Sequence, residues 1–318
     1  MLIRVGFEIT VECEQETPML LALYPHPSRV LDVIGQDGLS LAPPLHIVEF
    51  KDVFGNRCGR VVVPRGRTTL HSDFLVRDDG RPDPVNGDAP QQGVSDLPNE
   101  VIPFLTASRY VESDALTETA WRLFGSTPPG WTRVQAICDF VHRHISFGYQ
   151  HGRPTKTALD AYRERTGVCR DFAHLAVALC RAMNIPARYA SGWLGDIGVP
   201  AQGDPGDFCA WFEAYLGGRW HTFDARYNTP RIGRILMVRG RDAADVAMMT
   251  TFGANRLTAF EVWCDEVPAE RAQRAISEVF RGPERLDRRA QGIGQVEAAQ
   301  PHDGESGERE LERVGSRS

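Results

Sequence analysis

The segment Gly167-Val168-Cys169-Arg170-Asp171-Phe172-Ala173-His174 begins with a glycine that is expected to stop one helix. Two residues later, Cys169 begins a second helical pattern that runs to Met183. The exposed N–H groups and the dipole at a helix N-terminus favour negative charge, so they lower the pKa of a cysteine and make it a better nucleophile. Arg170 adds a positive charge beside it. We predict that Cys169 is a reactive thiol; the alternative is that it is one more small buried residue.

A second segment, Asp207-Phe208-Cys209-Ala210-Trp211-Phe212-Glu213-Ala214-Tyr215-Leu216 continuing to Thr222-Phe223-Asp224, predicts a β-hairpin with Gly217-Gly218 as its turn. In that register Leu216 pairs with Arg219, Ala214 with His221, Trp211 with Asp224 and Cys209 with Arg226. Because side chains alternate along a strand, one face carries Cys209, Trp211, Glu213, Trp220, Thr222 and Asp224. Asp224 is diagonal to Cys209 and within side-chain reach of it.

The chain from Cys169 to Asp224 resembles the transglutaminase-like (papain-like) superfamily. The likeness to the bacterial branch continues through Asn228-Thr229-Pro230-Arg231-Ile232-Gly233-Arg234 and the stretch 239–246. The resemblance implies an α+β fold, with a cysteine-bearing helix packed on an antiparallel sheet, preceded by an all-β sandwich domain. It implies that Cys169 is the nucleophile and that Asp224 orients the catalytic base. The family has the histidine of an HAW motif as that base, and this chain has Cys209 there.

No other histidine is well placed to replace the missing base. His221 has the opposite strand parity from Asp224, so only a β-bulge would bring it to the site. His174 lies five positions along the helix from Cys169, about 140° around the axis, and so faces elsewhere. For the remaining candidates we expect surface or structural roles: His142, His144 and His151.

Four regions are expected along the chain. Residues 1–85 form an all-β domain, 86–98 a linker, 99–281 the transglutaminase-like domain with its core motif at 163–228, and 282–318 a disordered tail. The expected strands of the first domain are 3–11, 19–24, 45–50, 59–63 and 68–76. The expected elements of the second domain are a helix capped by Ser113, helices at 134–145 and 158–165 with Gly167 as the stop of the latter, and strands at 187–194, 210–216, 219–225, 235–238 and 259–264.

Composition and charge argue against several classes of function. The net charge of −6 on 318 residues argues against nucleic-acid binding, and no apolar stretch has membrane-spanning length. The N-terminus is typical of a strand rather than a signal peptide, so we expect a cytoplasmic protein without membrane contact. The seven cysteines form no CxxC pair and there is no phosphate loop, so we expect no metal and no cofactor. The arginines from Arg231 to Arg241 are expected to pair with carboxylates on the Asp224 side and with Asp242 and Asp245; the alternative is an anionic ligand.

These features predict thiol acyl transfer on the amide bonds of a peptide or protein substrate, of the protease, amidase or transglutaminase type. The activity is expected to be impaired, because Cys209 replaces the histidine that would protonate the leaving amine. Two alternatives remain: a catalytically inactive binding or scaffold module, and a redox-sensitive Cys169/Cys209 pair. The sequence leaves open the substrate, the choice between hydrolysis and transamidation, whether this copy turns over at all, and the oligomeric state.

Overall fold

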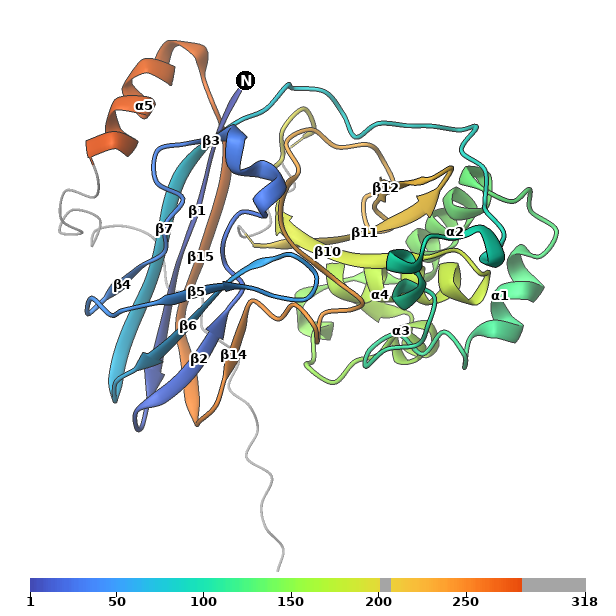
Figure 1. Cartoon of the computed structure of the whole chain (residues 1–318), viewed down its shortest axis with the longest axis horizontal. Coiled ribbons are helices and arrows are strands. Elements are labelled where there is room, and N and C mark those ends of the chain that lie inside the picture. Colours follow the sequence, from blue (N-terminus) through green and yellow to red (C-terminus); the bar gives the residue numbers. More distant parts are fainter. Residues whose placement is uncertain (201–206, 282–318) are drawn as a thin grey trace, which may run out of the picture. The chain divides into compact units, whose positions relative to one another are not determined.

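A β-sandwich occupies the first part of the chain, in a computed structural model that describes residues 1–200 and 207–281 (Figure 1). The sequence-predicted tail, 282–318, lies outside the described residues. One sheet has the strand order β15-β1-β7-β3, with β4 also on β7, and the other has the order β14-β2-β6-β5. The strands of the first are β1 (Leu2–Cys13), β3 (Val33–Ile34), β4 (Ser40–Ala42), β7 (Gly66–Arg77) and β15 (Asn255–Val267); those of the second are β2 (Thr17–Leu21), β5 (Val48–Lys51), β6 (Arg57–Val63) and β14 (Met249–Thr251).

Alternation of side chains explains how the two sheets share a core. In β1 the odd-numbered residues from Ile3 to Val11 are apolar and buried, which is the period of a strand with one face inward. They pack with Met19 and Leu21 of β2 and with Val61 and Val63 of β6 in one apolar cluster. The strand-rich N-terminal region predicted from the sequence is therefore present, with β3 and β4 as short additions.

The last strands of the described chain return to the sandwich. β15 pairs with β1 along its whole length, from Leu2 opposite Val267 to Cys13 opposite Asn255, with one irregularity between Thr10 and Val11. β14 pairs with β2 in the other sheet. The sequence range assigned to the second domain therefore supplies an edge strand to each sheet of the first.

The remainder is an α+β unit, as the sequence predicts. Its four-stranded antiparallel sheet has the order β12-β11-β10-β13, and a short parallel pair, β8 with β9, lies beside it. Its helices are α1 (Thr117–Phe124), α2 (Trp131–His144), α3 (Ala158–Glu164) and α4 (Cys169–Ala182), and its strands are β8 (Ser146–Phe147), β9 (Thr166–Gly167), β10 (Ala187–Trp193), β11 (Cys209–Leu216), β12 (Arg219–Phe223) and β13 (Ile235–Gly240). The chain also has a C-terminal helix, α5 (Ala272–Arg281), and 3₁₀ turns η1 (Pro27–Asp32), η2 (Val94–Asp96), η3 (Asn99–Phe104), η4 (Tyr149–His151) and η5 (Ala269–Arg271).

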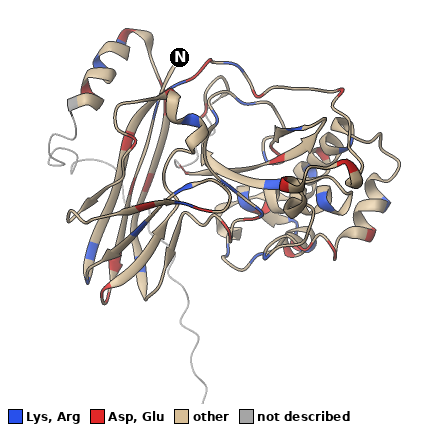
Figure 2. Ribbon diagram, in the orientation of Figure 1, with Lys and Arg blue, Asp and Glu red and all other residues tan. Residues whose placement is uncertain are grey.

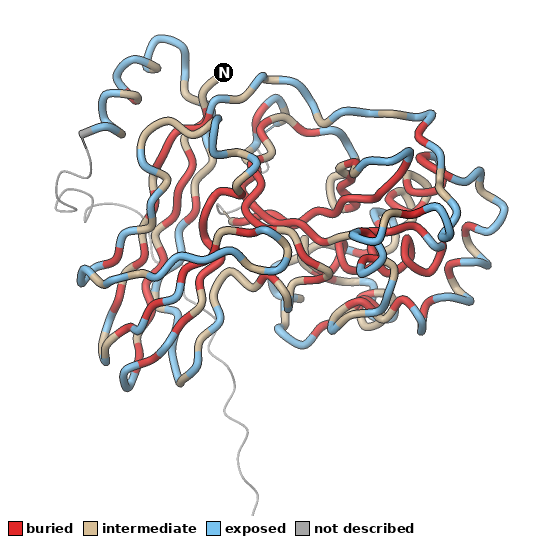
Figure 3. The backbone as a smooth tube through the Cα atoms, viewed as in Figure 1, coloured by how far each residue is buried: buried red, intermediate tan, exposed pale blue. Residues whose placement is uncertain are grey.

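Helix α4 is the centre of this unit. Every residue from Asp171 to Ala182 is buried, so the helix has no solvent face (Figure 3). It packs on β10 and β11 on one side and on α1, α2 and α3 on the others. A helix enclosed in this way is held rigidly, and it fixes the position of the cysteine at its first residue.

Two predicted helix ends are wrong. Ser113 does not cap α1, which begins at Thr117 after Leu116; the carbonyl of Ser113 instead accepts a hydrogen bond from the Thr117 hydroxyl at 3.0 Å. Gly167 does not end α3 either, because Arg165 already does so in the left-handed conformation, with φ of 58°. Gly167 belongs to β9.

Trp193 joins the sandwich to the α+β unit. Its side chain is fully buried and lies against Phe74 at 5.6 Å and Phe208 at 5.5 Å between ring centroids, and its indole N–H donates to the carbonyl of Gly6 at 3.2 Å. Burying a large apolar side chain contributes about 1.5–3 kcal/mol. The contact with Trp193 holds Phe208, the residue immediately before Cys209, against the sandwich. Within the described ranges, no helix is both long and apolar enough to cross a membrane.

Candidate active site

Cys169 is the first residue of α4, as predicted from its sequence context. Asp171 stabilises this helix start, because its carboxylate accepts a hydrogen bond from the Val168 N–H at 3.0 Å. Gly167 is needed for this turn: a Cβ at this position would lie 2.7 Å from the Cβ of Asp171. The N–H groups of the first helical turn have no acceptor within the helix, so they can stabilise negative charge on the sulfur or on a substrate oxygen beside it.

The β11–β12 hairpin also forms in the predicted register. Leu216 lies opposite Arg219 and Ala214 opposite His221, with no register shift. Gly217 and Gly218 both have positive φ, 56° and 83°, as a tight two-residue turn requires. The ladder ends at Phe212 opposite Phe223, so Asp224 and Arg226 lie just beyond the last pair.

The Cys169 thiol lies beside the thiol of Cys209, the residue at the position where the family has its histidine. Cys169 packs against the small cluster that contains Cys209 and Trp211, and all seven cysteines are free. A hydrogen bond from the Cys209 thiol lowers the pKa of Cys169, helped by the Ala210 N–H and the Arg226 guanidinium and opposed by burial. The same hydrogen bond, with burial and the nearby Asp224, raises the pKa of Cys209 well above its usual value. The arrangement thus favours a thiolate at Cys169 and a protonated thiol at Cys209.

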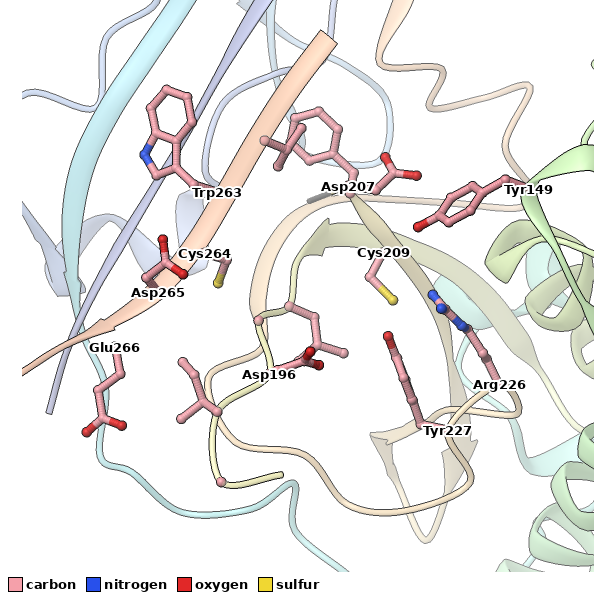
Figure 4. Close-up of a pocket in the computed structure, with 16 residues that line it drawn as sticks. Tyr149, Asp196, Asp207, Cys209, Arg226, Tyr227, Trp263, Cys264, Asp265 and Glu266 are labelled. Carbon is pink, nitrogen blue, oxygen red and sulfur yellow. The ribbon is translucent and has the colours of Figure 1, made fainter. Parts of the chain in front are cut away.

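Arg226 supplies the positive charge that the sequence analysis assigned to Arg170. The Arg170 guanidinium pairs instead with Asp171 at 3.2 Å and with the carbonyl of Arg153 at 2.6 Å. In Figure 4 the Cys209 sulfur, the Arg226 guanidinium and the Tyr227 hydroxyl point toward one another, with Tyr149 on the far side of Arg226. Arg226 lies here because the chain turns sharply after β12: the Asp224 carboxylate accepts hydrogen bonds from the N–H groups of Arg226 and Tyr227 at 3.0 and 3.1 Å.

Asp224 is buried just beyond the end of β12, and its charge acts on the Cys209 thiol. Its second oxygen accepts a hydrogen bond from Arg234 at 3.1 Å. Arg234 also pairs with Asp83 at 3.0 Å and lies over the ring of Trp211 at 4.6 Å. The carboxylate that would orient a histidine at position 209 is therefore held by the backbone turn and by a guanidinium.

The other arginines of this stretch also pair with carboxylates, but only Arg241 does so with one of the carboxylates expected from the sequence. Arg231 pairs with Asp196, Arg239 with Glu213 and Arg241 with Asp245. Basic and acidic residues are interspersed along the ribbon rather than gathered by sign (Figure 2). The arginines of this stretch serve mainly as internal cross-links between the sheets and the loops.

The histidines considered as substitutes for the base take up other positions. His221 points away from the thiols: it lies edge-on to Trp131 at 5.4 Å between ring centroids, and one ring nitrogen is 3.2 Å from the carbonyl of Leu216. His174 is fully buried, stacks on Tyr110 and accepts a hydrogen bond from the Ala243 N–H at 3.1 Å. His142, His144 and His151 bond to the Arg226 carbonyl, the Tyr162 carbonyl and the Gln150 side chain.

Two cavities meet at the thiol pair. One, of about 570 Å³, is lined by Cys169, and the other, of about 520 Å³, is lined by Cys209; Asp207 and Phe208 belong to the walls of both. The Cys169 cavity has a wall that is largely apolar and comes from the sandwich and the loop before it, formed by Ile9, Val246, Ala247, Met248, Met249, Leu257 and Phe260. The Cys209 cavity is polar, with four carboxylates in its wall: Asp196, Asp207, Asp265 and Glu266.

Two residues of the site were not singled out from the sequence. The sequence could have identified Arg226, because the predicted hairpin register places it opposite Cys209. The sequence could have identified Asp207 as well. It lies two residues before Cys209, and in an extended chain residues two apart point to the same side. Among the residues that the structure describes, no three histidine, cysteine, aspartate or glutamate side chains are grouped as metal ligands.

A cysteine at the start of an enclosed helix, facing an antiparallel hairpin with an aspartate at its end, defines a papain-like thiol site. Residues 118–225 match the model of the transglutaminase-like superfamily. A candidate cysteine protease from Cytophaga hutchinsonii, known from its crystal structure, is 31% identical with a TM-score of 0.73, over 85% of this chain and 91% of that chain. The chain belongs to the transglutaminase-like superfamily.

A curated relative gives a narrower match. The uncharacterized protein ML0607 of Mycobacterium leprae (strain TN) is 38% identical over 94 residues, which is 29% of this chain. The match covers 33% of that relative's own length, so it concerns one segment of it.

Proposed function

We propose that the protein performs thiol acyl transfer on amide bonds of a peptide or protein, with Cys169 as the nucleophile. The observation that carries this proposal is the hydrogen-bonded, half-buried thiol at the N-terminus of α4, beside a cavity large enough for a side chain or short peptide. Family membership and the similarity to the Cytophaga hutchinsonii candidate cysteine protease support the same kind of chemistry.

The residues suit the first step of such a reaction. The Cys169 thiolate attacks the carbonyl carbon of the substrate, and the N–H groups of the first helical turn stabilise the oxygen that becomes negative. The C–N bond then breaks, leaving a thioester on Cys169. Water or a second amine attacks that thioester, releases the acyl group and restores the thiolate.

Cys209 limits the second half of this chemistry. A histidine at this position could accept a proton and return it to the leaving nitrogen, whereas a thiol with a strongly raised pKa holds its proton. Loss of such general acid–base help commonly costs ~10²–10⁴-fold in rate. The proposed activity on amides is therefore weak, while activated esters, whose leaving groups need no proton, should still acylate Cys169.

The Cys169 cavity indicates which part of a substrate lies there. Its apolar wall, which includes Met248, Leu257 and Phe260, suits an apolar side chain on the acyl portion. The carboxylate-lined Cys209 cavity suits the amine portion, because an ammonium group is attracted to carboxylates. The proposed substrate is thus an amide of an apolar acyl group.

Acylation of the protein by a p-nitrophenyl ester of an apolar amino acid tests this proposal. Mass spectrometry of peptides from the treated protein should find the acyl group on Cys169, and the Cys169→Ala variant should give no burst of p-nitrophenol. Cys264→Ala is the matched control, because that thiol lines only the Cys209 cavity. Acylation that is equal in wild type and Cys169→Ala would overturn the proposal.

The contact between the two thiols favours one second candidate, a redox-sensitive pair. Hydrogen peroxide would convert the Cys169 thiolate to a sulfenic acid, and the Cys209 thiol would displace water from it to form the disulfide. In this scheme the two sulfurs lose two electrons and the peroxide gains them as water. Non-reducing mass spectrometry after peroxide treatment should detect the Cys169–Cys209 linkage; exclusive over-oxidation of Cys169 would contradict it.

A further inference from the structure

Asp207 lies at the junction of the two cavities. It lines the Cys169 cavity and the Cys209 cavity alike, and its charge acts directly on Cys169. In Figure 4 the carboxylate of Asp207 points toward Tyr149, and Arg226 lies on the same side of the pocket. No other titratable side chain is in the wall of both cavities, among the residues lining them in the described chain.

The surroundings of Asp207 give it suitable acidity. Burial raises the pKa of its carboxyl to about 6, against the opposing effects of the Phe208 N–H and Arg226. A carboxyl of this kind gives and takes protons near neutral pH, as a catalytic acid or base must. The neighbouring groups are poorer candidates: burial raises the pKa of Tyr227 to about 12, and Asp224 is held by Arg234 and two backbone N–H groups.

We propose that Asp207 is the residue that transfers protons at this site, and that it does, less effectively, the work for which the family has a histidine at position 209. This inference rests on the proposed function, in which Cys169 forms a thioester. It adds an acid and base that the superfamily pattern does not assign. In this role Asp207 is a catalytic residue, because its carboxyl, which lines both cavities, would exchange protons with the reacting groups themselves.

The proposed steps balance. After the Cys169 thiolate attacks the carbonyl carbon, the protonated Asp207 gives its proton to the leaving nitrogen as the C–N bond breaks. The amine departs, and Asp207 remains as a carboxylate. That carboxylate takes a proton from water while the oxygen attacks the thioester. The C–S bond breaks, the acid leaves, and both the Cys169 thiolate and the protonated Asp207 are restored.

The test separates the two steps with one substrate, a p-nitrophenyl ester of an apolar amino acid. Acylation of Cys169 by this ester needs no acid, and loss of the Asp207 charge favours the Cys169 thiolate, so Asp207→Asn should keep the amplitude of the p-nitrophenol burst and should not slow it. Deacylation needs a base, so the steady-state rate should fall by about 10²-fold, with acyl-Cys169 accumulating in mass spectra. Glu118→Gln, which alters an exposed carboxylate on α1 that lines neither cavity, should change neither phase.

The pH profile gives a second readout. The wild-type steady-state rate should rise as pH increases through about 6, where Asp207 loses its proton, and Asp207→Asn should lack this rise. The other titratable or charged groups that line these cavities are common to both proteins: Tyr110, Tyr149, Arg153, Cys169, Arg170, Tyr189, Asp196, Cys209, Arg226, Tyr227, Cys264, Asp265 and Glu266.

Three outcomes have distinct meanings. Slow deacylation with a normal burst supports the role of Asp207. An unchanged steady-state rate in Asp207→Asn, or an equal loss in burst and steady state, overturns that role and leaves Cys169 as the nucleophile. The absence of any Cys169-dependent burst in the wild type overturns the proposed function itself. In a Cys209→His background, the imidazole should make the Asp207→Asn defect smaller.

Discussion

The carboxylate of Asp224 accepts a hydrogen bond from the Arg234 guanidinium at 3.1 Å, at the place where the family would have a histidine as its neighbour. A carboxylate can accept about four hydrogen bonds. Arg234 and the N–H groups of Arg226 and Tyr227 account for three of them. The oxygen that accepts the hydrogen bond from Arg234 can therefore accept one more hydrogen bond. A histidine introduced at position 209 could donate it.

Replacement of Cys209 by histidine should raise amide turnover by about 10²-fold, because an imidazole between Cys169 and Asp224 can accept and return a proton. Release of a fluorescent amine from a peptide amide measures it. Cys209→Asn, which has a similar volume but transfers no proton, should show no gain, and Cys169→Ala in the histidine background should be inactive. Robust wild-type turnover that Cys209→His leaves unchanged would contradict this prediction, and would mean that Asp207 already supplies all the proton transfer that a histidine could.

Arg234→Met should destabilise the fold by about 3–5 kcal/mol, since it leaves Asp83 and Asp224 buried without their cation. The matched control is Arg256→Met, because Arg256 forms a surface pair with Glu12 and its side chain is 74% exposed. Such exposed pairs contribute about 0–1 kcal/mol. Urea unfolding of the three proteins measures the difference, and equal midpoints would contradict the structural role of Arg234.

Cys169 should be the first thiol modified by iodoacetamide at mildly acidic pH, because its neighbours lower its pKa while burial raises that of Cys180 and, to about 12, that of Cys264. Arg226→Gln should slow this labelling by removing a stabilising charge. Arg170→Gln is the control, because Arg170 pairs with Asp171. Peptide mapping by mass spectrometry reads the result, and equal labelling of all accessible thiols would refute it.

The apolar wall of the Cys169 cavity should set acyl preference. An ester of leucine should acylate Cys169 faster than one of alanine, by about 10–200-fold for each group that fills the cavity. Phe260→Ala should reduce this ratio, because Phe260 lines the cavity and lies 6.0 Å from Phe208 between ring centroids. Val53→Ala, on a side chain that is 93% exposed, is the control. A ratio that Phe260→Ala leaves unaltered would place the acyl group elsewhere.

His26 should make the fold sensitive to acid. Burial, with Arg239 nearby, lowers its pKa to about 4 in the folded protein, against 6.5 for the free side chain. Between these values the unfolded chain binds more protons, so the free energy of unfolding falls as pH decreases from 6.5 to 4, by up to ~1.4 kcal/mol per pH unit. Asp207 acts in the opposite direction, because its pKa is raised to about 6.

The substitution His26→Gln isolates this effect, because Asp207 is present in both proteins. The variant should lose less stability than wild type over that pH range, although its midpoint at pH 7 can be lower. Urea unfolding at a series of pH values measures the slopes. Parallel slopes for wild type and His26→Gln would contradict the assignment.

Local signals predicted the helix start at Cys169 and the hairpin. Cys169 begins α4 because Gly167 and Asp171 shape the preceding turn, and both are visible in the sequence. Gly217-Gly218 determined the hairpin register, and with it the orientation of His221. These features depend on residues a few positions apart, so periodicity and turn chemistry are sufficient to infer them.

Features that depend on distant parts of the chain were not predictable in the same way. The raised pKa of Asp207 comes from burial, which no local pattern reveals. The pairing of β15 with β1 joins residues more than two hundred positions apart, and its strand pattern gives no indication of its partner. Strands β3 and β4 have two and three residues, too few for a periodic signal.

The pairing of β1 with β15 has a consequence for how this protein can be altered by recombination. A gene segment encoding residues 99–281 would include β15 but not the strand that it pairs with, and would lack Ile9 of the Cys169 cavity. The thiol unit is therefore not a self-contained cassette. Recombination between related genes would preserve the cavity only if the N-terminal strands and β15 came from the same parent.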